Sequence, residues 1–95
     1  GITAPTLTVI PTDSSFNIEG QKVAQQFRAA GISVATDVGT KKLQKKIKSA
    51  SDALVEYILV LGDNEAASQK YTVKNLADGT ETSGSIDTLI KTITT

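Results

Sequence analysis

The order of hydrophobic and polar positions predicts three strands alternating with two helices in the first two-thirds of the chain. Short, mostly apolar and β-branched runs at 7–10, 32–36 and 57–61 are typical of strands inside a sheet. Between them, segments 16–30 and 40–54 repeat their apolar residues every three or four positions, which is the period of an amphipathic helix. This βαβαβ order favours parallel strands joined by right-handed crossovers.

The last third of the chain departs from this alternation. Residues 62–69 are expected to form a loop or a short turn. Residues 70–76 alternate as a half-buried strand does, and the Asp-Gly pair at 78–79 is a hairpin signal before a returning strand at 81–83. A final helix, capped by Ser85, has apolar positions Ile86, Leu89, Ile90 and Ile93. The pattern predicts a three-layer α/β domain with three helices and a five-stranded mixed sheet whose first three strands are parallel.

The second predicted helix concentrates positive charge. Thr40 is its expected N-cap, and an apolar stripe of Leu43, Ile47, Ala50 and Leu54 faces the core. Five lysines, with no acidic residue among them, are expected on the opposite side: Lys41, Lys42, Lys45, Lys46 and Lys48. Such a run is usually a solvated helix face. Because like charges at i,i+4 weaken a helix slightly, a use in contacting a polyanion is the alternative.

Composition excludes several classes of function. Ten acidic residues balance ten basic ones, so net charge predicts no partner. The absence of Cys and His removes disulfides, thiolate metal sites and the commonest general base. No phosphate-binding glycine loop is present, no apolar run approaches the ~20 residues that span a bilayer, and no signal peptide is visible. We expect one non-catalytic domain over 1–95, without metal or membrane, in the cytoplasm.

Six short motifs carry a resemblance to a known family. In order and spacing they are similar to the C-terminal anticodon-binding domain of class II aminoacyl-tRNA synthetases, and most similar to that of the histidyl enzymes. Residues 64–69 depart from the family pattern because they lack the glycine that usually follows the glutamate. The motifs are V-I-P at 9–11, R-A-A-G-I at 28–32, V-x-x-D at 34–37, K-K-L-x-K-x-x-x-x-A at 41–50, Y-I-L-V-L-G-x-x-E at 57–65 and T-V-K-N-L-x-x-G at 72–79.

The resemblance implies a role in binding the anticodon stem-loop of a tRNA. It also implies that the chain is a fragment of a larger, homodimeric histidine–tRNA ligase, whose separate catalytic domain would use ATP and magnesium. The 95-residue chain would need no cofactor of its own. Its contribution would be affinity for tRNA and discrimination among anticodons.

Two groups of residues are predicted to contact tRNA. The five lysines named above would meet phosphates, which give affinity without base specificity. Thr12, Asp37 and Glu65 each follow a predicted parallel strand, and the loops at such strand ends gather in one crevice. The resemblance adds Lys74 and Asn75 as base readers. The competing interpretation is that these polar residues only cap helices and pair with their neighbours.

Other functions stay open at this point. A non-catalytic relative of the family could sense uncharged tRNA or serve as a protein-interaction module. An unrelated doubly wound domain could bind a small anion at residues 12–15, where a helix N-terminus is predicted. Titration with tRNA separates these functions, because only the tRNA-binding classes show steeply salt-dependent binding.

Overall fold

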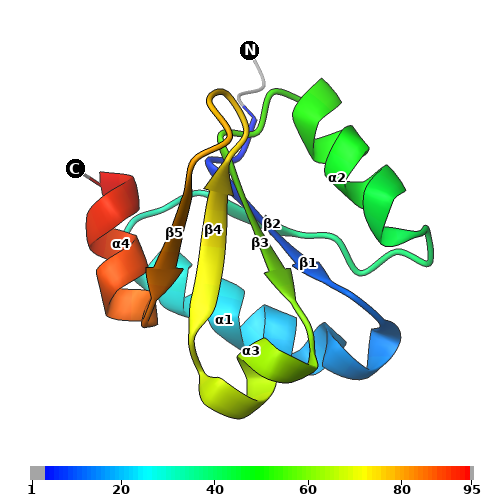
Figure 1. The fold of residues 1–95 in the computed structure, drawn as a ribbon, viewed down its shortest axis with the longest axis horizontal. Coiled ribbons are helices and arrows are strands. Elements are labelled where there is room, and N and C mark those ends of the chain that lie inside the picture. The colour runs from blue at the N-terminus through cyan, green and yellow to red at the C-terminus, as the bar shows by residue number, and fades with distance from the viewer. Residues whose placement is uncertain (1–3, 95) are drawn as a thin grey trace.

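The computed structural model, which describes residues 4–94, contains one five-stranded mixed sheet in the order β2-β1-β3-β4-β5 (Figure 1). β1 pairs in parallel with β2 and β3, and β4 is antiparallel to both β3 and β5. The predicted fold class is therefore confirmed, but the described residues contain four α-helices where three are predicted. The strands are β1 (Leu7–Pro11), β2 (Val34–Thr36), β3 (Tyr57–Leu61), β4 (Tyr71–Asn75) and β5 (Glu81–Gly84); the helices are η1 (Ser14–Phe16), a 3-10 turn, and α1 (Asn17–Ala29), α2 (Leu43–Asp52), α3 (Asp63–Ser68) and α4 (Ile86–Thr94).

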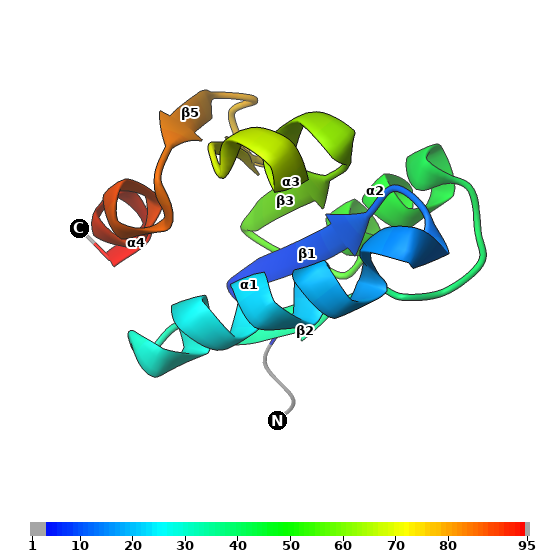
Figure 2. The ribbon, with the colours of Figure 1, turned by 90° about the horizontal axis from the view of Figure 1, so that it is seen from below.

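Helices cover the two faces of the sheet unequally. α1 and α4 lie on one face, and α2 lies on the other (Figure 2). On the α1 and α4 side, Val23, Phe27 and Leu89 pack with residues of β1, β3 and β4 in the larger core cluster. The smaller cluster joins Ala50 and Val55 to Ile10 and Ile58. α2 packs over β1, so the α2-side face of β4 and β5 has no helix over it among the described residues (Figure 1).

α2 is shorter than predicted at both ends. It begins at Leu43, because Lys42 at the N-cap position is extended (φ −62°, ψ 151°) and no side chain caps the helix; Thr40 is not its cap. It ends at Asp52, where the Val55 N–H donates to the Ala50 carbonyl, as in a Schellman motif. Leu54 therefore has a left-handed backbone (φ 62°) and is 84% exposed, so the apolar stripe ends at Ala50.

The segment expected as a loop or short turn contains the short helix α3. Its six residues lack the repeated apolar positions from which a helix is predicted, so the sequence pattern does not indicate this helix. Asp63 and Glu65 lie in its first turn, where negative charge complements the helix dipole. Gln69 ends the helix with a left-handed backbone (φ 56°), a conformation that glycine adopts most readily. α3 directs Glu65 back toward the end of the sheet.

The turn at 78–79 and the cap at Ser85 are as predicted. Gly79 takes a left-handed conformation (φ 77°) in the β4–β5 hairpin, and Gly31 takes one (φ 88°) where α1 ends. Ser85 accepts a hydrogen bond from the Thr88 N–H at 3.3 Å, which caps α4. These turns set the direction of each strand and therefore the position of the polar residues discussed next.

Candidate nucleic-acid interface

The uncovered part of the sheet holds a shallow depression of about 270 Å³. It brings together two residues that the sequence predicts as base readers, Glu65 from α3 and Lys74 from β4. Apolar side chains from α2 and β3 form its floor, and the polar side chains of β4 and β5 form its rim. The lining residues are Ile47, Ile58, Val60, Glu65, Thr72, Lys74 and Glu81. The arrangement offers a charged acceptor and a charged donor beside apolar surface, which suits an unstacked base.

Strand alternation directs Lys74 toward this open face. Tyr71 and Val73 point into the larger core, so Thr72 and Lys74 point to the other side of β4. Lys74 lies beside Ile58 of β3 and Glu81 of β5 in the strand register. The hydroxyl groups of Thr72 and Ser83 are 2.7 Å apart and hydrogen-bond across the same two strands. The open face is therefore polar along β4 and β5 and apolar toward β3.

Thr12 and Glu65 meet at Gly62. A Cβ atom at Gly62 would lie 3.2 Å from Thr12 Oγ1 and 3.9 Å from Glu65 Oε1. The Thr12 N–H donates to the Leu61 carbonyl at 2.9 Å, which aligns the ends of β1 and β3. The rule that the ends of parallel strands gather correctly predicts this proximity.

Asp37 lies further along the same end of the sheet. Its strand, β2, is at the sheet edge with β1 between it and β3. The Asp37 carboxylate accepts a hydrogen bond from the Gly39 N–H at 3.1 Å. Part of its hydrogen-bonding capacity is therefore used to stabilise the turn that follows β2. Asp37 does not line the depression that Glu65 and Lys74 share.

Asn75 lies at the opposite end of the sheet. It pairs with Tyr57, the first residue of β3, whereas Thr12 and Glu65 follow the last residues of their strands. Its side-chain oxygen accepts hydrogen bonds from the backbone N–H groups of Ala77 (2.8 Å) and Asp78 (3.3 Å). The structure thus places Asn75 far from Thr12 and Glu65 and on the opposite face of β4 from its neighbour Lys74, and it gives Asn75 a role in the hairpin turn. Its contact with a base stays a prediction.

The prediction that all five lysines lie on the solvent face is wrong for Lys46. This residue is 5% exposed, and its ammonium group donates to the carbonyls of Asp37 (3.2 Å) and Pro11 (3.4 Å). On a helical wheel Lys46 is only about 60° from Leu43, so it borders the apolar stripe instead of opposing it. Lys46 therefore joins the ends of β1 and β2 to α2 and has no access to a phosphate.

The other four lysines are exposed but differ in setting. Lys41 and Lys42 precede α2 and share a depression with Thr12, which places them beside the predicted base readers. Lys45 is on the exposed side of α2. Lys48 forms an i,i+4 ion pair with Asp52, with 3.1 Å between Nζ and Oδ2. Because this pair is exposed, it contributes little to stability and leaves Lys48 able to exchange partners.

The local structure at residues 12–15 is that of a capped turn. The Asp13 carboxylate accepts hydrogen bonds from the Ser15 hydroxyl and backbone N–H, both at 2.6 Å, and these bonds lower the pKa of Asp13. A carboxylate of the chain itself already occupies the position that a bound anion would take. The anion-binding alternative thus receives no support from this segment.

Sequence reasoning missed Thr72 and Glu81, which complete the depression. The signal for Thr72 was available, because residues two apart on a strand share a face and Thr72 is two residues from Lys74. Glu81 could be placed only from the hairpin register. Among residues 4–94, no cluster of three or more acidic groups could hold a metal ion, and no helix is long and apolar enough to cross a membrane.

Comparison with known proteins gives consistent results. A family model described as "Anticodon binding domain" matches residues 6–95. The chain is 36% identical to the threonine–tRNA ligase of Acidiphilium cryptum over 84 residues, which are 88% of this chain and 13% of that protein. It is 38% identical to the histidine–tRNA ligase of Laribacter hongkongensis over 64 residues, 67% of this chain and 15% of that protein.

Solved structures share the fold over nearly the whole chain. A histidyl-tRNA synthetase from Nostoc aligns with a TM-score of 0.90 at 27% identity, covering 97% of this chain and 22% of that one. The RNA-binding domain of a threonyl-tRNA synthetase from Cryptosporidium parvum aligns with a TM-score of 0.87 at 22% identity, covering 96% and 23%. The chain thus spans less than a quarter of each of these proteins.

Proposed function

Since the chain belongs to the family of anticodon-binding domains, we propose that it binds the anticodon stem-loop of a tRNA on the open face of β3, β4 and β5. The observation that carries this proposal is that Glu65 shares the depression on that face with Lys74 and lies beside Gly62 together with Thr12. Glu65 would accept hydrogen bonds from base amino groups, and Lys74 would donate to base acceptors. Thr12 would offer a hydroxyl at the same place.

Lys41, Lys42 and Lys45 would hold the phosphate backbone. The first two border Thr12, so a strand whose bases reach Glu65 would pass them. Each phosphate neutralised on a single strand adds about −0.7 to the slope of log affinity against log salt, and three lysines would contribute about −2. Lys41→Gln, Lys42→Gln and Lys45→Gln combined should therefore flatten the slope for every anticodon. Lys22→Gln, on α1 at the other face, is the matched control.

Base reading is tested through Glu65. Glu65→Gln keeps the shape of the side chain but replaces one acceptor by a donor. We expect it to change the preference among anticodon variants by about 1–3 kcal/mol at one base, the size of a good base contact. Glu56→Gln, an exposed residue before β3, should leave the preference unchanged. Equal weakening for all anticodons in Glu65→Gln would assign Glu65 a structural role.

The whole protein is proposed to be a histidine–tRNA ligase. The chain would be its 1–95 anticodon-binding fragment, without a cofactor of its own, and the catalytic domain would use ATP and magnesium in a homodimeric, cytoplasmic enzyme. The similarity to histidine–tRNA ligases supports this identity. The similarity to a threonine–tRNA ligase over 88% of the chain makes threonine the second candidate. Titration with histidine and threonine tRNAs distinguishes them, and no binding of either would favour a protein-interaction module.

A further inference from the structure

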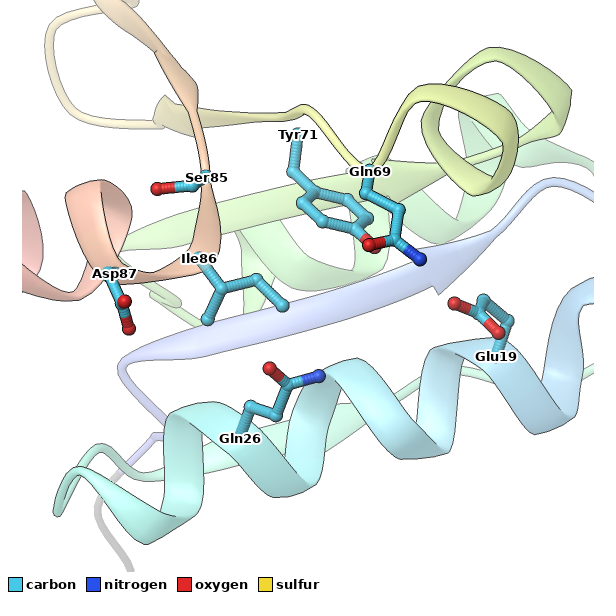
Figure 3. Close-up of a pocket in the computed structure, with 7 residues that line it drawn as sticks. All are labelled: Glu19, Gln26, Gln69, Tyr71, Ser85, Ile86 and Asp87. Carbon is cyan, nitrogen blue, oxygen red and sulfur yellow. The ribbon is translucent and has the colours of Figure 1, made fainter.

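A second depression lies on the opposite side of the sheet from the proposed tRNA face. It is enclosed by α1, the start of β4 and the start of α4 (Figure 3). Its volume is about 250 Å³, below the ~300–1,000 Å³ of pockets that take drug-sized ligands, so it suits a single side chain. The lining residues are Glu19, Gln26, Gln69, Tyr71, Ser85, Ile86 and Asp87.

The charge of this pocket is negative. Glu19 and Asp87 contribute carboxylates from two different helices, and none of the lining residues is basic. Phosphate groups are repelled by such a lining, so RNA is a poor occupant. A bound metal ion is also disfavoured, because the described residues contain no cluster of three or more acidic groups that could hold one. The charge favours an organic cation.

Tyr71 supplies independent evidence for a ligand. The residue is only 4% exposed and belongs to the larger core, and its ring extends from β4 into the pocket (Figure 3). Its hydroxyl makes no hydrogen bond to any residue that the structure describes. Burial, followed by the charge of Glu19, raises the pKa of Tyr71, so its hydroxyl keeps its proton. The hydroxyl is not among the fully buried polar atoms, so it opens onto the pocket, and the space before it is where a hydrogen-bonding partner would sit.

We propose that this pocket binds the guanidinium group of an arginine side chain presented by a protein surface. A guanidinium has five N–H donors in one plane, and the pocket offers it acceptors from α1, β4 and α4. Glu19 lies on the Tyr71 side of the pocket, so its carboxylate can pair with the guanidinium while the planar group lies against the Tyr71 ring. Asp87, on the far side of Ile86, adds negative charge at longer range (Figure 3). Because the pocket and the open face lie on opposite sides of the sheet, tRNA and the protein partner can bind at the same time.

The test is an NMR titration of the 95-residue chain with N-acetyl-arginine amide. N-acetyl-citrulline amide, which has nearly the same shape but no charge, is the matched probe. We expect shifts at Gln69, Ser85 and Asp87 with the arginine probe only. Glu19→Gln should weaken that binding at least about tenfold, or about 1.4 kcal/mol, while Glu56→Gln should not change it. Equal shifts from citrulline, no shifts from arginine, or an unaltered affinity in Glu19→Gln would each overturn the proposal.

Tyr71→Phe separates a ligand contact from a structural role. Because the hydroxyl has no intramolecular partner, the free energy of unfolding at neutral pH should be unchanged, while arginine binding should weaken. A loss of stability with unchanged binding would instead mean that the hydroxyl serves the fold. Saturation with tRNA should leave the affinity for the arginine probe unchanged, because the two sites lie on opposite sides of the sheet. Arginine binding and tRNA binding are measured separately, so one can fail without the other.

Discussion

The two faces of the sheet have opposite characters although they share the same strands. On the α1 and α4 side, Phe27 and Leu89 are completely buried against the strands. On the other side, α2 stops short of β4 and β5, and Lys74 and Ser83 are exposed. Within β4 the change occurs from one residue to the next, because Val73 is buried and Lys74 is not. The coverage by helices, and not the composition of the strands, decides which face is free to bind.

The same difference explains why lysines next to each other in sequence have different roles. Lys45 is exposed, whereas Lys46 is held by two backbone carbonyls at the ends of β1 and β2. Both carry one positive charge, but only Lys45 can offer it to a nucleic acid. A count of basic residues therefore overstates the charge available for binding, and the position of each residue relative to the sheet must be known.

The largest expected effect comes from truncating the covered face. Phe27→Ala removes a ring that is completely buried, and we expect it to lower the free energy of unfolding by about 3–5 kcal/mol. Ile18→Ala in the same helix is the control, since Ile18 is 74% exposed and its truncation should stay within about 0.5 kcal/mol. Urea denaturation measures both. Similar losses in the two variants would contradict the assignment of the covered face.

The next largest effect on stability is expected from substitution of Lys46, compared with its neighbour Lys45. Lys46→Met keeps the length of the side chain but leaves the carbonyls of Pro11 and Asp37 without a donor, so we expect a loss of about 1–3 kcal/mol. Removing a buried charge offsets only part of this cost. Lys45→Met should stay within about 0.5 kcal/mol but weaken tRNA binding. Equal stability of the two variants would mean that Lys46 is not anchored as described.

A stabilising change is expected at the end of α2. Leu54 has a left-handed backbone and buries little of its side chain, so Leu54→Gly relieves strain at almost no loss of contact. The greater freedom of glycine in the unfolded chain opposes this gain, and the net increase in the free energy of unfolding should be about 0.5–1 kcal/mol. Leu43→Gly, at the first residue of α2, should instead destabilise the protein because it removes a side chain packed against the smaller core cluster. Destabilisation by Leu54→Gly would indicate that Leu54 makes contacts beyond those seen.

The smallest expected effect is a pH dependence of the free energy of unfolding that arises from Tyr71 on the covered face. The pKa of Tyr71 is raised above its ordinary value of 10.0 by burial and, second, by Glu19. Above pH 10 the unfolded chain releases this proton while the folded chain retains it, so the free energy of unfolding falls as the pH rises through the raised pKa. Tyr71→Phe should remove this part of the alkaline loss. If the free energy of unfolding falls equally at alkaline pH in Tyr71→Phe and in the unsubstituted chain, the raised pKa of Tyr71 would be contradicted.

Much of the fold could be predicted because periodicity reports which faces are apolar. The parallel order of the first three strands also correctly predicts that Thr12 and Glu65 lie close together. α3 escaped prediction because six residues cannot show a helical repeat. The end of α2 was misplaced because Leu54 fits the apolar stripe, although the chain leaves the helix two residues earlier.

The candidate site was less predictable because its contacts join distant parts of the chain. Lys46 reaches Pro11, 35 residues away in the sequence, and no local pattern reveals that pairing. Asn75 shares a strand with Lys74, but the antiparallel direction of β4 carries it to the far end of the sheet. The unpaired hydroxyl of Tyr71 gives no signal in the sequence, where it is one apolar position of an alternating strand.

The most direct test asks which face of the sheet a tRNA anticodon stem-loop touches. NMR of the 95-residue chain, titrated with the stem-loop alone, would report the backbone and side-chain signals of both faces at once. We expect shifts at Glu65, Thr72 and Lys74, extending to Lys41 and Lys42, with the signals of Gln26 and Tyr71 unchanged. Shifts confined to α1 and α4, or none at saturating stem-loop, would contradict it.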